Sequence, residues 1–266
     1  MRRLIILVLI VLGATSCEVK IRPPSEEGTV FAAIQWHDPG QAIDVVFIPD
    51  DDYGDLSVEA NLQAFLDDVA NLIDEGYWQN CALAYNLGGF NFWFMTLTGD
   101  VQPPAEGICP DVDWPDLDDV AFAEVKVLIH PNELRDCSFA EGTTTEPNGY
   151  RTVVHETSHA AFVMPDEYCC DGGYWELPPI LYDTADDCNN DAQNADWRDC
   201  ECFTDNSGED WCRSEDSIAD IMSRGGATVW EYGPADWVIV GGVLGGLGMG
   251  APAEPEVFAP DAWDWP

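Results

Sequence analysis

Two histidines and a glutamate occur together in the order His-Glu-x-x-His. They are His155, Glu156 and His159, and the 266-residue chain has only 4 histidines. Residues four apart lie on one face of a helix, so both imidazoles can reach a single point. Neutral imidazoles bind Zn²⁺ well, and a third protein ligand would leave one tetrahedral position for water. Glu156 is close enough to accept a proton from a water molecule that the metal activates.

The flanking sequence predicts the helix that this chemistry requires. Residues 150–164 carry apolar side chains on both sides of the motif, which would pack the helix into a core. Pro165 is expected to end the helix, because proline lacks an N–H and disfavours the α conformation in the residue before it. Asp166 and Glu167 follow directly, and a chain that turns back here can bring a carboxylate to the metal. The alternative for this pair is solvated surface, since the chain has 50 acidic residues.

The motif, followed after six residues by Asp-Glu-Tyr, resembles the igalysin (IgA-peptidase) family of zinc metalloendopeptidases, in the metzincin clan. Residues 44–53 look like the first core strand and acidic loop of that family, and Ile221-Met222-Ser223 looks like a metzincin Met-turn. The resemblance covers residues 30–250 and implies an α/β fold. In that fold a twisted mixed sheet packs on the active-site helix, above a smaller, loop-rich, disulfide-bonded subdomain.

The resemblance also implies roles for individual residues. The zinc ligands are His155, His159 and Asp166, with Glu167 as the alternative third ligand, and Glu156 is the general base. Met222 forms an apolar floor beneath the histidines. Tyr232 and Tyr168 are candidates to support the oxyanion, with simple packing as the alternative for both.

The chain departs from the family pattern at three points. Ser158 stands where the family usually has glycine, before the second histidine. No glycine lies between His159 and Asp166 to turn the chain, and Pro165 occupies the usual third-ligand position, where it cannot bind a metal. Immunoglobulin A is therefore not inferred as the substrate.

The N-terminus predicts export. A short basic start precedes an apolar run at residues 4–12 that is too short to span a bilayer, as in a secretory signal peptide. Residues 1–17 end in Ala-Thr-Ser-Cys, which resembles a bacterial lipoprotein cleavage box, so Cys17 is the expected lipidation site; an ordinary signal peptide is the alternative. Residues 18–29 are then a tether, residues 30–250 the catalytic domain, and residues 251–266 a C-terminal tail.

The cysteines agree with an exported protein. The chain has 10, and nine remain if Cys17 is lipidated. Paired two-residue spacing typical of structural zinc sites is missing, so four disulfides and one leftover thiol are expected, with unassigned connectivity. Residues 169–214 are rich in Cys and Asp and poor in periodic apolar residues, which predicts a loop-rich insert held by cross-links.

A net charge of −40 excludes a nucleic-acid-binding surface. It does not indicate disorder, because 46% of the residues are hydrophobic. Calcium is a further candidate cofactor. Asp187-x-Asn189-x-Asp191 invites that interpretation, but Ala192 and Arg198 break the EF-hand pattern, and no calcium ligand is assigned.

Apolar patterns place the remaining elements. Residues 30–36, 44–48, 90–97 and 125–129 are predicted strands, and residues 56–73 carry a helical apolar stripe. A further helix is expected over residues 234–244. His130 directly follows a predicted strand and is interpreted as a structural histidine.

These features together predict a zinc-dependent endopeptidase of extracellular proteins, anchored to the bacterial cell envelope by its N-terminal lipid. Its partners would be a protein or peptide substrate and the membrane. The alternative is a non-catalytic, calcium-dependent binding lipoprotein on a peptidase scaffold.

Overall fold

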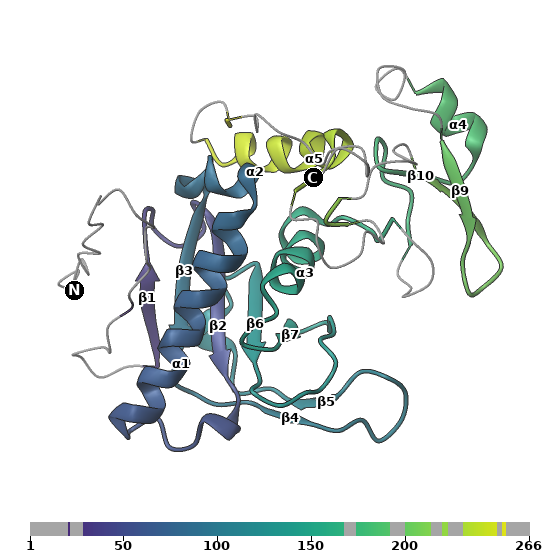
Figure 1. The fold of residues 1–266 in the computed structure, drawn as a ribbon. Helices are drawn as coiled ribbons and strands as arrows, with labels where there is room; N and C mark the ends of the chain where they lie inside the picture. The colour runs from purple at the N-terminus through teal and green to yellow at the C-terminus, as the bar shows by residue number, and fades with distance from the viewer. Residues whose placement is uncertain are drawn as a thin grey trace, which may run out of the picture. The chain divides into compact units, whose positions relative to one another are not determined.

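A computed structural model gives the fold of the chain (Figure 1). It describes residues 21, 29–167, 174–191, 200–213, 220–222, 231–248 and 252–253. The predicted signal peptide with Cys17, most of the tether and tail, Tyr168 and the pair Cys169-Cys170 lie outside the described residues. The chain divides into two compact units, residues 1–79 with 87–156 and residues 80–86 with 157–266.

The first unit is built on a five-stranded mixed sheet in the order β1-β3-β2-β6-β7. Its strands are β1 (Val30–Ile34), β2 (Ile43–Pro49), β3 (Phe90–Met95), β6 (Val125–Ile129) and β7 (Thr143–Thr145). Strand β2 runs parallel to β3 and β6, and β7 is parallel to β6, whereas β1 is antiparallel to β3. All residues of β2 and β3 are buried, which explains why these strands read as continuous rather than alternating apolar runs.

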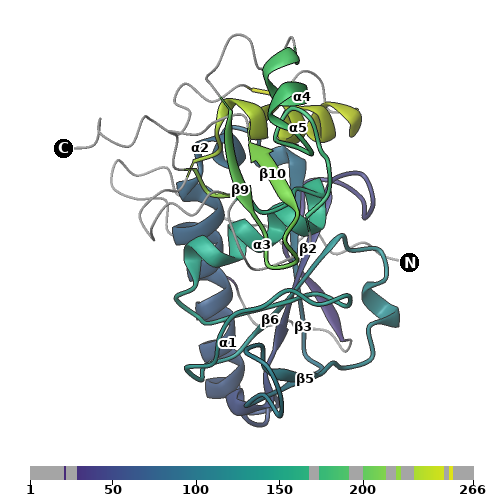
Figure 2. The ribbon, with the colours of Figure 1, turned by 90° about the vertical axis from the view of Figure 1, so that its right-hand side faces the viewer.

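Both faces of this sheet are covered. Helix α1 (Glu59–Asn71) lies along one face in both views, and its Phe65 ring lies 6.4 Å from that of Phe94 (Figures 1 and 2). Val46 and Ile48 alternate to the other face, in an apolar cluster with Trp93. The sheet is therefore the middle layer of a core, as an α/β architecture requires.

Shorter elements complete the first unit. They are η1 (Asp51–Tyr53), a π-helical turn η2 (Leu72–Gly76), η3 (Tyr77–Gln79), η4 (Leu87–Gly89), the hairpin β4 (Asp100–Gln102) and β5 (Asp111–Asp113), and η5 (Asp118–Val120).

Helix α3 (Tyr150–Phe162) carries the His-Glu-x-x-His motif and continues from the first unit into the second, the division falling after Glu156. The helix is anchored by Val153 and Val154, both fully buried. At Gly76 a side chain would lie 3.0 Å from the carbonyl oxygen of Tyr150, so glycine permits the end of η2 to approach α3 closely.

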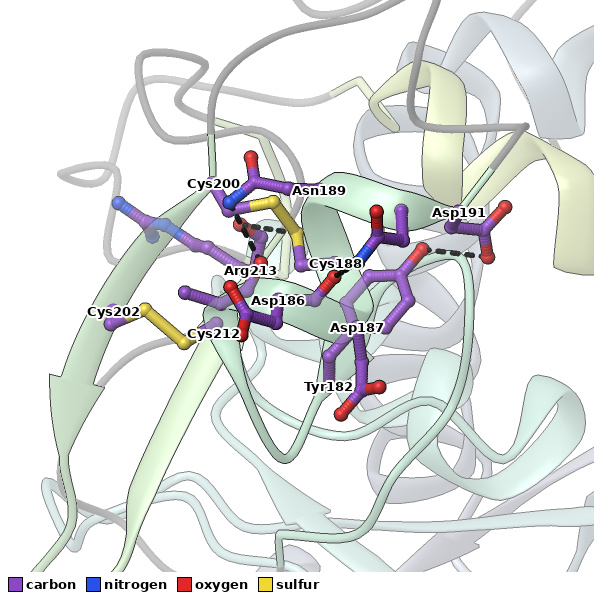
Figure 3. The surroundings of a disulfide bond; sticks show 12 residues. Tyr182, Asp186, Asp187, Cys188, Asn189, Asp191, Cys200, Cys202, Cys212 and Arg213 are labelled. Carbon is purple, nitrogen blue, oxygen red and sulfur yellow. Dashed lines mark hydrogen bonds between the residues drawn. A yellow bond between two sulfur atoms is a disulfide. The ribbon is translucent and has the colours of Figure 1, made fainter.

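The second unit contains α2 (Cys81–Ala84), β8 (Leu181–Tyr182), α4 (Ala185–Asn190), β9 (Glu201–Thr204), β10 (Asp210–Arg213) and α5 (Pro234–Gly246). The three strands form an antiparallel sheet in the order β8-β10-β9. The insert that was predicted to be loop-rich therefore contains regular structure. Its sequence lacks the apolar periodicity that would have indicated these elements, and disulfides stabilise them instead. Two disulfides, Cys188–Cys200 and Cys202–Cys212, join these elements (Figure 3).

The α/β class and the presence of disulfides are confirmed. The described residues contain three of the four disulfides that were expected, the third of which joins Cys109 to Cys137 in the first unit. The predicted strands all occur, and the C-terminal helix runs two residues beyond its expected end. The predicted helix end at Pro165 is wrong, because α3 already ends at Phe162. Among the residues that the structure describes, no helix combines the length and apolar character needed to cross a membrane.

Candidate metal centre

His155 and His159 lie one turn apart on α3, on the face that the four-residue spacing predicts. His155 is buried and His159 is partly exposed. One potential ligand atom from each histidine and one from Asp166 all lie within 4.8 Å of one another. The three residues belong to one continuous stretch, the end of α3 and the turn after it.

The orientation of the His159 ring is set by its other nitrogen. Nδ1 lies 2.7 Å from the carbonyl oxygen of Met164, a distance at which a protonated Nδ1 donates a hydrogen bond. This interaction favours the tautomer whose Nε2 carries a lone pair. Nε2 lies 3.4 Å from Oδ1 of Asp166, so the nitrogen that can bind a metal faces the carboxylate.

The turn after α3 brings Asp166 to this position without glycine. Val163 has a φ of 56°, in the left-handed region that normally favours glycine. Met164 then donates its N–H to the carbonyl of Ser158 at 3.3 Å, and its side chain is fully buried. Val163 thus replaces the glycine turn that the sequence lacks, and Pro165 only follows it.

The donor set fits a zinc ion. Two imidazoles and a carboxylate are a usual ligand set for catalytic Zn²⁺. Ligands bound tetrahedrally at the usual zinc distances lie about 3.4 Å apart, which agrees with the 3.4 Å between His159 Nε2 and Asp166 Oδ1.

Glu167, the alternative third ligand, lies in a different group. Its carboxylate converges with those of Asp220 and Asp236, all three buried, within 4.8 Å. Its backbone N–H donates to the carbonyl of Met222 at 3.3 Å, and its carbonyl accepts a hydrogen bond from Arg213 at 2.9 Å. The geometry therefore brings Asp166, and not Glu167, to the two histidines.

Met222 is fully buried, and its N–H donates to Oδ1 of Asp220 at 2.9 Å. Its carbonyl contact with Glu167 ties this segment to the residue next to Asp166. Ser223, the third residue of the predicted Met-turn, lies outside the described residues.

Tyr232 is buried against the end of α3. Its hydroxyl lies 2.7 Å from Oγ of Ser158, and its ring packs edge-on against Phe162 at 6.2 Å. These contacts give Tyr232 a packing role in this structure. Ser158, at which the resemblance led us to expect glycine, thus serves as a hydrogen-bonding partner for the tyrosine.

The side chain of Glu156 contacts a residue that the sequence did not indicate as functional. Its Oε2 accepts a hydrogen bond from the hydroxyl of Ser138, in the segment before β7. Glu156 is half-buried and Ser138 is exposed. The only sequence signal near Ser138 is its neighbour Cys137, which the disulfide count includes without giving a location.

No protein-family model matches this chain, and a search of curated proteins finds no significant match.

His130 directly follows β6 and is buried. Its Nε2 lies 3.3 Å from Oδ1 of Asp136, and its Nδ1 lies 3.2 Å from the carbonyl oxygen of Asn132. Burial, the largest single influence, lowers the pKa of His130, but the hydrogen bond and charge of Asp136, together with hydrogen bonds to Asn132, outweigh it and the pKa is raised. His130 is thus bonded within its own loop.

The aspartates that suggested calcium have separate partners (Figure 3). Asp187 accepts a hydrogen bond from Thr184, the residue that caps α4, and Asp191 accepts one from the hydroxyl of Tyr182 at 3.0 Å. Asn189 donates to the carbonyl of Ala185. These side chains stabilise α4 and its ends, so the calcium interpretation of this segment gains no support.

A third acidic group follows β2. Asp50, Asp51 and Asp52 bring their carboxylates within 4.8 Å. Asp50 accepts backbone hydrogen bonds from Asp52 and Val101, whereas Asp51 and Asp52 are exposed. This arrangement is that of a capped turn on a solvated surface.

Proposed function

We propose that this protein is a zinc-dependent endopeptidase with a metzincin-like catalytic domain. The observation that carries the proposal is the convergence of His155, His159 and Asp166. Glu156 lies next to His155 on the helix that carries both histidines. Two neutral imidazoles and one carboxylate are suited to holding zinc with an open fourth position.

The proposed chemistry divides between the ion and the protein. Bound Zn²⁺ would supply Lewis-acid activation of water and of the substrate carbonyl. Glu156 accepts the proton of the attacking water and delivers it to the leaving amine. The carbonyl of Met164 holds the His159 ring in the required orientation.

The metzincin part of the proposal has support from the described elements. A five-stranded mixed sheet precedes the motif helix, and a buried methionine, Met222, is linked through Glu167 to the ligand-bearing turn. Val163 supplies a left-handed turn at a position where the family relies on glycine. Membership of the igalysin family remains part of the same proposal.

We propose that the protein works outside the cytoplasm, as a lipoprotein anchored through Cys17. Disulfides such as Cys109–Cys137 persist in oxidising compartments, which supports export. A charge of −40 disfavours nucleic acids as partners. As an endopeptidase, the protein would act on proteins or peptides.

Zinc content and hydrolysis together test the proposal. Protein purified without chelators is expected to contain one zinc per chain and to cleave denatured casein or members of a proteome-derived peptide library. Glu156→Gln should keep zinc and lower kcat about 10²- to 10⁴-fold. Glu59→Gln, an exposed glutamate on α1, is the matched control. Metal-free protein contradicts the proposal, and a zinc-bound parent that cleaves nothing indicates a binding protein instead.

A second comparison tests the third ligand. Asp166→Ala is expected to weaken zinc binding by more than about 100-fold, because loss of an outer-shell partner alone costs 10- to 100-fold. Glu167→Ala should retain zinc affinity near that of the parent. The reverse order, measured by competition with a chromophoric chelator, would assign the ligand to Glu167.

A further inference from the structure

We propose that Ser138 is a positioning residue for Glu156, held in place by a hairpin that the Cys109–Cys137 disulfide anchors. This inference rests on the proposed function, because it assigns the hydroxyl a role only if Glu156 is the general base. Both residues belong to the first compact unit.

The contact restricts the carboxylate of Glu156. The Ser138 hydroxyl donates to Oε2, so rotation of the carboxylate breaks a hydrogen bond to a charged group. Oε1 then remains the oxygen available for proton transfer. A glutamate side chain has several rotatable bonds, and fixing its end in advance lowers the entropy lost in reaching the reactive arrangement.

The backbone around Ser138 is rigidly hydrogen-bonded. Thr144 donates its N–H to the carbonyl of Cys137 at 2.9 Å, and Phe139 donates to the carbonyl of Gly142 at 2.7 Å. A β-bridge pairs Ser138 with Thr143 in β7. Ser138 is thus attached to the edge of the main sheet.

Gly142 allows this hairpin to lie close to β6. A Cβ at this position would lie 2.6 Å from the carbonyl oxygen of Lys126, closer than real side chains approach. The hairpin is therefore fixed against the sheet by backbone contact.

Two further attachments hold the residues just before Ser138. Cys137 is buried, and its sulfur is bonded to that of Cys109. Asp136 contacts His130 and accepts a hydrogen bond from the N–H of Glu146 at 3.0 Å. An exposed serine would ordinarily sample several rotamers on a mobile loop, but here its backbone is fixed on both sides.

Steady-state kinetics on a cleaved library peptide test the inference. Ser138→Ala is expected to lower kcat about tenfold, the value of a hydrogen bond to a charged group, with KM and zinc content unchanged. Ser138→Thr keeps the hydroxyl and should restore most of kcat. In a Glu156→Gln background, Ser138→Ala should have no further effect, because the two residues act as one unit.

The anchor is tested with a matched pair of double variants. Cys109→Ala with Cys137→Ala should lower kcat as Ser138→Ala does, whereas Cys202→Ala with Cys212→Ala should leave kcat near that of the parent. Crystal structures of the parent and Ser138→Ala should show the Glu156 carboxylate in one orientation and in several, respectively.

The outcomes separate the two proposals. An active parent with an unchanged kcat in Ser138→Ala overturns this inference alone. A raised KM with unchanged kcat also overturns it, since Ser138 would then contact substrate rather than position the base. A zinc-bound parent that cleaves no peptide contradicts this inference and the proposed function together.

Discussion

The main sheet and the small sheet of residues 181–213 are stabilised in different ways. Strand β2 is fully buried and lies between two parallel neighbours. In the small sheet, β9 is largely exposed, and the buried cluster consists of Tyr182 and two cystine sulfurs, those of Cys188 and Cys212. Apolar burial orders the first region, whereas covalent cross-links order the second.

Truncating a core aromatic in the main sheet should have the largest effect on stability. Phe47 is fully buried, and its ring lies 6.3 Å from that of Phe92. Phe47→Ala is expected to lower the free energy of unfolding by about 3–5 kcal/mol, measured by urea denaturation. Phe203→Ala, at a half-buried aromatic of β9, is the control and should cost far less. Equal losses would contradict the comparison.

Removing the disulfides should destabilise the small sheet. Replacing Cys188 and Cys200, or Cys202 and Cys212, by alanine should lower the local stability of the small sheet by about 2–4 kcal/mol per disulfide. Hydrogen exchange should then lose protection in β8, β9 and β10 while residues 43–49 remain protected. Global loss of protection would show that the main sheet depends on these bonds.

A smaller, pH-dependent effect is expected where the chain leaves β6. Because the pKa of His130 is raised above 6.5 in the folded state, its stabilising contribution is complete below pH 6.5 and is lost as pH rises through the raised pKa. The contribution should be about 1–2 kcal/mol. Thermal unfolding between pH 6 and 9 measures it, and Asp136→Asn should remove this pH dependence. A parent whose stability rises over this range would contradict the assignment.

The smallest effect on stability is expected at the end of α3, where the chain turns through a valine with a positive φ. Val163 is 60% exposed, so little packing would be lost on truncation. Val163→Gly should raise the melting temperature, with a gain of up to about 1 kcal/mol, because glycine adopts positive φ without a Cβ clash. Val163→Ala keeps the clash and should give no comparable gain.

The sequence predicted the main sheet well for a physical reason. Strand β6 occurs at the predicted bounds, and β2 extends the prediction by one residue at each end. Buried strands of a parallel sheet need unbroken apolar runs, which are visible without any tertiary information. Helix α1 is shorter than the predicted residues 56–73, since η2 continues the apolar stripe with a different hydrogen-bond pattern.

The features that the sequence did not predict depend on tertiary contacts. The small sheet is set by cysteine pairing, which spacing cannot assign. The choice between Asp166 and Glu167 depends on the turn at Val163, a residue type that rarely adopts positive φ. Ser138 meets Glu156 across 18 positions of sequence, and no local pattern marks such a contact.

The pairing of β2 has a consequence for biosynthesis. Val45 pairs with Phe92 and also with Val125, 80 residues further along the chain. About half of the polypeptide must therefore leave the ribosome before this strand has both neighbours. A nascent chain arrested before residue 125 exposes an apolar strand edge and is expected to aggregate unless a chaperone covers it.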